Sequence, residues 1–414
     1  MELAPEEEHM LEGKEGKAAK KSMEILIALG KIFGAKRLIN IKSVQVAGVS
    51  YHNLGDAGLD YLTELSMDGK VKVPTTLNPA GMDLRDYKKL GISDTFAKKQ
   101  LQVIDSFKKL GISSTATCTP YLVGNKPKFG DHIAWSESSA VCFANSVLGA
   151  RTNREGGPSA LASALTGKTP EYGMHLDENR HAQIIVNVES ELKTQSDYSA
   201  LGYAIGTKIK NKIPYIKGIK NPTLDQLKNF SASIATYGGT AIYHIENVTP
   251  NNFARDREVE ENEPLYHETK NIKRAKQEIP KKEITITYED LKDAYDFLND
   301  PVEPDFISIG CPHASLEELR EIATLLKGKK TKIPFWIATA RKIKEEADKL
   351  GYTKIIEDTG AILACDTCMA VAPLKGRFRC LMTNSAKACY YGRGSNNFKT
   401  RFASLKECIN QAII

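Results

Sequence analysis

Three isolated cysteines are the residues in this chain whose types and spacing point most directly to chemistry. Cys118, Cys311 and Cys368 each lie in a short polar run that would place a thiolate at the edge of a sheet: Thr117-Cys118-Thr119-Pro120, Gly310-Cys311-Pro312-His313 and Asp366-Thr367-Cys368. Zinc ribbons and fingers usually bring their ligands in close pairs, whereas these three lie far apart. Three isolated thiolates suit a cubane iron–sulfur cluster with one open iron, which can act as a Lewis acid on substrate.

One of these cysteines belongs to a closer pair, Cys365-Asp366-Thr367-Cys368, whose spacing is shared by redox dithiols and zinc sites. Cys365 ends the apolar run at 361–364, so we expect it to be a buried strand residue. Cys368 lies beyond the turn made by Asp366 and is the better ligand. The other cysteines lie among apolar or helical residues and are expected to be structural: Cys142, Cys380, Cys389 and Cys408.

Polar groups suited to an anionic substrate lie in three further segments. Residues 135–140 place hydroxyls and a carboxylate directly before an apolar run, which is typical of a helix N-terminus. Such an N-terminus offers backbone N–H groups to an anion. Alternatively, Ser136 or Ser138 would serve as a simple helix cap. Residues 151–157 form a polar loop with two guanidinium groups that suits a carboxylate or phosphate. Lys387 is expected in a loop after a strand, as an anion contact.

The surroundings of Cys311 predict a strand followed directly by a helix. Residues 305–310 read as a short strand, and Ser315-Leu316-Glu317-Glu318 is a capping box, so Cys311 is expected in the turn between them. There, backbone N–H groups and the helix dipole favour a thiolate or an anionic substrate. His313 would orient substrate, hydrogen-bond a cluster sulfide or be an ordinary turn residue, and His132 and His244 are weaker candidates.

The elements that must position these residues alternate between helix and strand. Residues 5–34 predict one amphipathic helix, and strands are expected at 38–49 and 71–76. Such alternation indicates an α/β fold with mostly parallel sheets, in which ligands collect beyond the carboxyl ends of the strands. The polar segments at 48–51, 77–83, 117–120 and 310–313 all follow apolar runs, so we expect them to converge at one crevice.

Length and composition bound the remaining possibilities. A chain of 414 residues is expected to form two or three domains, and a net charge of +6 spread along the chain is weak evidence for nucleic-acid binding. Eight cysteines are too sparse for a disulfide scaffold. With no apolar signal core and no run of membrane-spanning length, the protein is expected to be cytoplasmic. The charged stretch at 251–282 reads as a surface excursion.

Several long motifs resemble the aconitase X family across nearly the whole chain. The matching stretches are 46–51, Gly55-Asp56-Ala57-Gly58, 75–83, 135–145, 149–160, Gly310-Cys311-Pro312-His313, Asp366-Thr367-Cys368-Met369 and Thr383-Asn384-Ser385. The resemblance implies an aconitase-like multi-domain α/β/α fold with the active site in the cleft between domains. We expect an aconitase-like region at 1–285, composed of two interleaved subdomains, and a C-terminal domain at 286–414. Cys365 and Cys389 depart from the small residues that family members often carry there.

The resemblance also implies an activity and a site. It implies a [4Fe–4S] cluster on Cys118, Cys311 and Cys368, and dehydration of (R)-5-phosphomevalonate to trans-anhydromevalonate 5-phosphate in the archaeal mevalonate route to isoprenoids. Carried over by motif, the substrate-binding residues would be Gly48, Val49, Ser50, Asn78, Pro79, Glu137, Ser138 and Lys387. The family needs a small swivelling domain that supplies a serine as base. No segment here suits that role, so a separate small subunit is expected as partner.

Two alternatives remain open from the sequence. Bacterial relatives of the same family are cis-3-hydroxyproline dehydratases, but phosphate-binding groups and a separate small subunit favour phosphomevalonate. An iron-sensing RNA-binding protein is the alternative from another class, since some relatives of aconitase have that role. The spread charge and the lack of aromatic-basic motifs argue against it.

Overall fold

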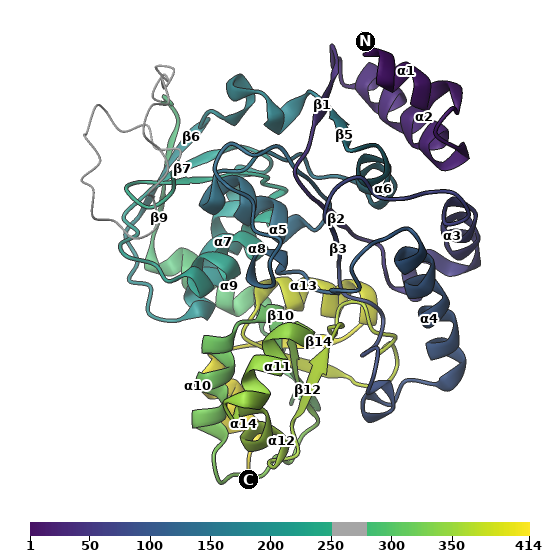
Figure 1. Ribbon diagram of the computed structural model, residues 1–414. Coiled ribbons are helices and arrows are strands. Elements are labelled where there is room, and N and C mark those ends of the chain that lie inside the picture. The colour runs from purple at the N-terminus through teal and green to yellow at the C-terminus, as the bar shows by residue number, and fades with distance from the viewer. Residues whose placement is uncertain (251–279) are drawn as a thin grey trace.

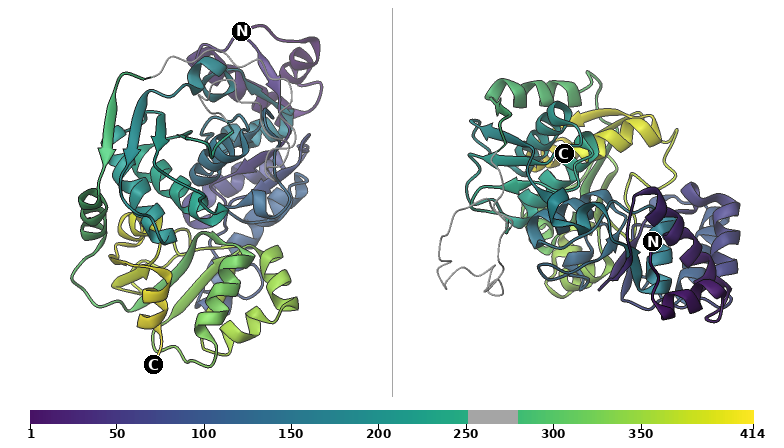
Figure 2. Two further views of the ribbon diagram at one scale, coloured as in Figure 1. Left: turned by 90° about the vertical axis from the view of Figure 1, so that its left-hand side faces the viewer. Right: turned by 90° about the horizontal axis from the view of Figure 1, so that it is seen from above.

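Three α/β lobes make up the computed structural model, which describes residues 1–250 and 280–414. Figures 1 and 2 show the two chain termini at opposite ends of the molecule, with the first lobe at one end and the third at the other. Apart from one antiparallel pair, β1 with β5, the paired strands of the named sheets run parallel, which confirms the predicted fold class. Most of the charged excursion predicted at 251–282 lies outside the described residues.

The first lobe is built around the parallel sheet β3-β2-β4, with α3, α4 and α6 packed on it. Its elements are α1 (Pro5–Glu12), α2 (Lys17–Ile32), β1 (Leu38–Asn40), β2 (Val44–Val46), α3 (Tyr51–Leu65), β3 (Thr75–Leu77), η1 (Tyr87–Leu90), α4 (Asp94–Lys109), η2 (Pro120–Leu122), β4 (Ala134–Trp135), α6 (Gly157–Thr166), β5 (Lys168–Pro170), η4 (Gly173–His175) and η5 (Asp177–Arg180).

The second lobe is built around the parallel sheet β8-β7-β6-β9 and a large apolar core that includes Trp135, Phe230 and Tyr243. Its elements are α5 (Ser138–Phe143), η3 (Ala144–Leu148), β6 (Ile184–Val188), α7 (Gln195–Ile209), β7 (Pro214–Lys217), α8 (Leu224–Gly238), β8 (His244–Ile245), β9 (Glu283–Ile286) and α9 (Tyr288–Leu298). The domain boundary predicted after residue 285 falls within β9, which pairs with β6.

The third lobe is a five-stranded parallel sheet in the order β12-β11-β10-β13-β14. Its elements are β10 (Phe306–Ala314), α10 (Leu316–Leu326), β11 (Phe335–Thr339), α11 (Arg341–Lys349), α12 (Tyr352–Glu357), β12 (Ile362–Cys365), β13 (Cys380–Thr383), α13 (Ala386–Asn396), β14 (Lys399–Phe402) and α14 (Leu405–Ala412). An apolar cluster that includes Met82, Leu90, Phe306 and Trp336 joins it to the first lobe.

Two sequence predictions of element boundaries were wrong. Residues 5–34 form two helices, because Gly13 and Gly16 adopt left-handed φ values of 85° and 99° between α1 and α2. The strand expected at 305–310 extends to Ala314, because Ala314 pairs with Thr339 of β11 beyond a break in register. Cys311 therefore lies within β10 rather than in a turn. The predicted capping box at Ser315 does begin α10, and another at Thr287 begins α9.

Two further predictions were wrong in extent. The strand expected at 38–49 is two short strands, β1 and β2, which belong to different sheets. Of the strand expected at 71–76, only the last two residues belong to a strand, β3. Every helix in the described ranges is too short or too polar to cross a membrane. The polar loops that follow β2, β3 and β4 contact the third lobe, and the site forms there.

Candidate active site

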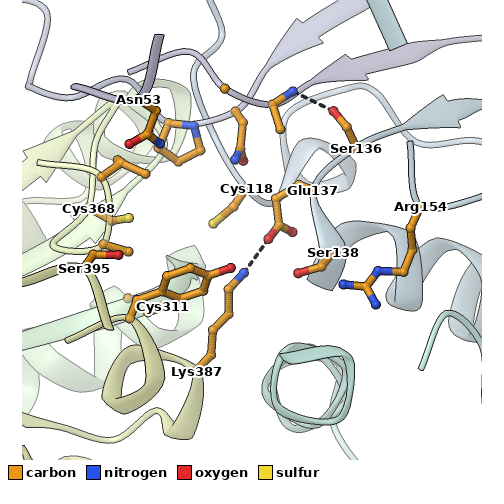
Figure 3. Close-up of a pocket in the computed structure, with 18 residues that line it drawn as sticks. Asn53, Cys118, Ser136, Glu137, Ser138, Arg154, Cys311, Cys368, Lys387 and Ser395 are labelled. Atoms are coloured by element: carbon orange, nitrogen blue, oxygen red, sulfur yellow. Dashed lines mark hydrogen bonds and ion pairs between the residues drawn. The ribbon is translucent and has the colours of Figure 1, made fainter. Parts of the chain in front are cut away.

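A pocket of about 350 Å³ lies between the first and third lobes. Figure 3 shows its side chains converging from segments that are far apart in sequence. Members of all four segments expected at one crevice line it. The lining residues are Ala47, Gly48, Asn53, Asn78, Pro79, Cys118, Ser136, Glu137, Ser138, Arg154, Gly310, Cys311, Cys368, Ala370, Val371, Lys387, Tyr391 and Ser395.

Three of the eight cysteines line this pocket, and they are Cys118, Cys311 and Cys368. Cys118 follows the bridge between Leu77 and Ala116, Cys311 lies in β10, and Cys368 follows β12. All eight cysteines are buried and free of disulfides. Cys365 ends β12 and is buried, as expected from the apolar run that it ends, and it does not line the pocket. Asp366, the expected turn residue before Cys368, has a φ of 62°.

Burial controls the protonation of the three pocket thiols. It raises the pKa of Cys118, Cys311 and Cys368, and that of Cys311 rises to about 12, while the nearby Lys387 ammonium acts in the opposite direction. These thiols therefore remain neutral near pH 7 unless a strong cationic partner displaces their protons. Metal binding does this, because the thiolate is the form that binds.

Three free thiols that line one pocket are donors of the kind that an iron–sulfur cluster takes. Within the described ranges, no three His, Cys, Asp or Glu side chains converge on one point where a lone metal ion would bind. A cubane cluster does not require such convergence, because each thiolate holds a different iron. The backbone N–H of His313 donates to Cys118 Sγ at 3.2 Å, and N–H donors to sulfur are among the groups that tune such clusters.

A buried ion pair forms the wall beside the cysteines. Lys387 Nζ donates to Glu137 Oε1 (Figure 3). It also donates to Ser139 Oγ at 3.1 Å. Glu137 caps α5, because its Oε2 accepts the Ala140 N–H at 2.7 Å. Burial opposes both charges, yet the pKa of Lys387 lies above its usual value because of Glu137, and that of Glu137 lies below because of Lys387. The pocket thus holds both groups charged.

The structure corrects the prediction that Lys387 lies in a loop. It is the second residue of α13 and is only 6% exposed. Tyr391 and Ser395 follow it at intervals of four residues, so the three side chains share one helix face, which lines the pocket. This spacing was the signal in the sequence that could have identified Tyr391 and Ser395.

Two further groups in the pocket are open to a ligand. The buried amide oxygen of Asn78, just after β3, accepts no hydrogen bond within the described chain. Arg154 donates to the Gly239 carbonyl at 2.9 Å and forms no ion pair with any described residue. Since anions are the usual partners of guanidinium groups, Arg154 is available for a carboxylate or phosphate. The sequence analysis had predicted such an anion contact from the two guanidinium groups of the loop at 151–157.

Of the substrate-binding residues expected from the sequence, six line the pocket and two do not. Gly48, Asn78, Pro79, Glu137, Ser138 and Lys387 line it. Val49 is buried in the first-lobe core, and Ser50 donates its hydroxyl hydrogen to the Val371 carbonyl at 2.9 Å.

The helix cap expected at Ser136 or Ser138 is instead Glu137. Ser136 bonds the backbone of Gln45 and Ala47. His132 and His244 lie outside the pocket.

Comparisons with known proteins agree along the whole chain. Residues 1–178, 182–296 and 304–414 match the family models described as aconitase X first, second and third domain. A phosphomevalonate dehydratase large subunit from Thermococcus kodakarensis is 49% identical, with all of both chains covered. One from Methanosarcina mazei is 46% identical over 100% of this chain and 97% of the relative.

A solved structure and a more distant relative complete the comparison. The crystal structure of Thermococcus kodakaraensis aconitase X in its holo-form is 47% identical, with both chains fully covered and a TM-score of 0.88. A cis-3-hydroxy-L-proline dehydratase from Pseudomonas aeruginosa is 33% identical over 98% of this chain but only 68% of the relative. About a third of the length of the Pseudomonas aeruginosa enzyme therefore has no counterpart in the match to this chain.

Proposed function

This chain belongs to the aconitase X family, and from that premise we propose that it is the large, catalytic subunit of an iron–sulfur hydro-lyase. Its substrate would be (R)-5-phosphomevalonate and its product trans-anhydromevalonate 5-phosphate, a step in the mevalonate route to isoprenoids. The observation that carries the proposal is the pocket itself, which joins three free cysteines to Lys387, Arg154 and Glu137. The full-length likeness to phosphomevalonate dehydratase large subunits supports it.

Cys118, Cys311 and Cys368 would hold a [4Fe–4S] cluster, which supplies Lewis acidity toward an oxygen of the substrate when bound. The chain's own polar groups then fix where the substrate lies. Arg154 offers a guanidinium group to one of the substrate's anions, and the Asn78 amide oxygen can accept from a hydroxyl. Fixed dipoles and charges of this kind, in a pocket with little water, are worth several kcal/mol in a transition state.

The proton acceptor would come from outside this chain. Elimination of water removes a proton from the carbon next to the carboxylate, and Glu137 is poorly suited to take it. Its carboxylate already accepts hydrogen bonds from Lys387, Ser139 and Ala140, which lower its pKa against the effect of burial. A separate small subunit that brings a serine to the pocket mouth would supply the base. The name "large subunit" of the relatives supports such a partner.

Anaerobic reconstitution tests the proposal. The purified chain is loaded with iron and sulfide and assayed with and without the small subunit of a phosphomevalonate dehydratase, on phosphomevalonate and on cis-3-hydroxyproline. We expect about four irons per chain, dehydration of phosphomevalonate only with the small subunit, and no turnover of hydroxyproline. Turnover by the chain alone would contradict the two-subunit arrangement, and preference for hydroxyproline would contradict the substrate.

A further inference from the structure

The His313 side chain has no role in the chemistry above, yet this residue contacts every segment that carries a pocket cysteine. Its side chain is completely buried and does not line the pocket. It therefore lies beneath the pocket wall, where its backbone N–H meets Cys118 Sγ. The contacts of its ring and backbone reach the first, second and third lobes.

The imidazole ring joins the segments of Cys118 and Cys368. Nδ1 lies 3.0 Å from Thr117 Oγ1, and Nε2 lies 3.0 Å from the Thr367 carbonyl oxygen. A carbonyl only accepts, so Nε2 carries the hydrogen, and in the neutral imidazole Nδ1 then accepts from the Thr117 hydroxyl. Thr117 Oγ1 in turn accepts the Thr119 N–H at 3.1 Å. The ring thus spans two residues that immediately precede cysteines.

The backbone of His313 completes the connection. Its N–H donates to Cys118 Sγ at 3.2 Å, and its carbonyl accepts from Lys228 Nζ at 3.2 Å. Lys228 is fully buried in α8 and is held by Asp225 and Glu318. This places His313 between the cysteine segments and a buried charge network of the second and third lobes.

We infer that His313 is a positioning residue that fixes the three thiols at the mutual spacing a cluster requires. Its ring does not line the pocket, and it acts through Thr117 and Thr367. Groups that orient metal ligands from behind are typically worth about 10–100-fold in metal affinity. The inference rests on the proposed cluster at Cys118, Cys311 and Cys368.

Replacements of the ring separate its two hydrogen bonds while they leave the backbone N–H to Cys118 in place. His313→Ala removes both bonds, His313→Asn keeps an acceptor near Nδ1, and His313→Gln keeps a donor near Nε2. The matched control is His244→Gln, since His244 is also buried and places Nε2 2.8 Å from a carbonyl oxygen, that of Arg180. His244 lies outside the pocket.

The readouts are iron and sulfide per reconstituted chain, the half-time of iron loss to a chelator, and the electron paramagnetic resonance spectrum of the reduced cluster. For His313→Ala we expect iron loss about tenfold faster or more, and an altered spectrum, at unchanged far-ultraviolet circular dichroism. His313→Gln or His313→Asn should recover part of the retention. His244→Gln should lower thermal stability without changing either cluster property.

Wild-type retention and spectrum in His313→Ala would overturn the inference. If His313→Ala fails to fold, Thr117→Val provides the test, because it removes the hydroxyl that donates to Nδ1 and keeps the imidazole ring. Wild-type cluster retention and spectrum in Thr117→Val would also overturn the inference. A wild-type chain that takes up no iron contradicts the proposed function instead. The two failures are therefore distinguishable.

Discussion

At the scale of single residues, the Glu137–Lys387 pair combines a structural and a chemical role. Lys387→Ala leaves the Glu137 carboxylate buried without its cation, which typically costs about 3–5 kcal/mol of unfolding free energy. We also expect kcat/KM to fall by about 100-fold or more. Denaturant unfolding and steady-state kinetics with the small subunit measure the two effects.

A double variant separates these roles. Glu137→Gln with Lys387→Met buries no charge, so it should regain most of the lost stability while activity stays low. Lys354→Ala is the control, because that lysine forms an exposed pair with Asp358 and should change neither quantity. Normal kinetics in Lys387→Ala would remove this residue from the site.

The pocket cysteines should differ sharply from the others. Cys118→Ala, Cys311→Ala and Cys368→Ala should each lose the proposed cluster, because each removes one of its three proposed ligands. Cys365→Ala and Cys389→Ala should largely keep it, since neither residue lines the pocket. Iron analysis after anaerobic reconstitution measures this. A full cluster in Cys368→Ala together with its loss in Cys365→Ala would reverse the assignment within the pair.

Arg154 offers a test of substrate recognition. Arg154→Ala should raise KM for phosphomevalonate by about tenfold or more, because the pocket loses a cation that has no carboxylate partner in the described chain. Arg151→Ala is the matched control from the same loop, where the guanidinium group pairs with Asp177 and lies outside the pocket. An unchanged KM for Arg154→Ala would show that substrate binds without this group.

Some of these residues could be found from the sequence and others could not. Cys368 was separable from Cys365 because a turn residue lies between them. The burial of Lys387 was not predictable, because its partner Glu137 lies far away in sequence and belongs to another lobe. The same holds for Ser50, whose position in the family motif suggested substrate but whose hydroxyl bonds the Val371 carbonyl.

At the scale of elements, the packing of β10 on β11 sets the position of Cys311. Gly310 has a φ of 92°, and a Cβ added there would lie 2.1 Å from the Ala338 carbonyl oxygen of β11. Gly310→Ala should therefore push the two strands apart, lower the unfolding free energy by more than about 2 kcal/mol and reduce iron uptake. Urea unfolding and iron analysis measure both effects.

Gly328 provides the matched comparison. It has a similar φ of 75°, but a Cβ there would meet nothing within 4 Å. Gly328→Ala should cost only the strain of the left-handed backbone, about 1 kcal/mol, with normal iron uptake. Equal effects of the two substitutions would show that contact with β11 is unimportant.

Element types were easier to predict than element ends. The capping box at Ser315 identified the start of α10, because its hydrogen bonds are local. The end of β10 depends on the pairing of Ala314 with Thr339, which no local pattern reveals. The break between α1 and α2 was available from Gly13 and Gly16, since both favour left-handed backbone.

At the scale of the whole molecule, buried histidines make stability sensitive to acid. Burial, together with His132, Arg180 and Arg151, lowers the pKa of His175 from 6.5 to about 3. Between these values the unfolded chain binds a proton that the folded chain does not. Above about pH 6.5 this group therefore does not reduce the free energy of unfolding. Below that pH the free energy of unfolding falls, and it continues to fall as the pH drops toward about 3.

The His175→Gln variant isolates this effect. Between about pH 7 and about pH 5.5, wild type should lose about 1.3 kcal/mol more unfolding free energy than the variant does. Urea unfolding at the two pH values measures the difference. Identical losses in both proteins would mean that His175 does not contribute to the acid sensitivity.

Because the three pocket cysteines lie in two different lobes, a cluster that they hold would link these lobes. Cys118 belongs to the first lobe, and Cys311 and Cys368 belong to the third. A cluster held by all three would be a cross-link that closes a long loop of chain, as a disulfide does, and would restrict the unfolded ensemble. Iron supply would then set the melting temperature as well as the rate of turnover. Oxidative loss of the cluster would remove this cross-link between the first and third lobes at the same time as it ends catalysis.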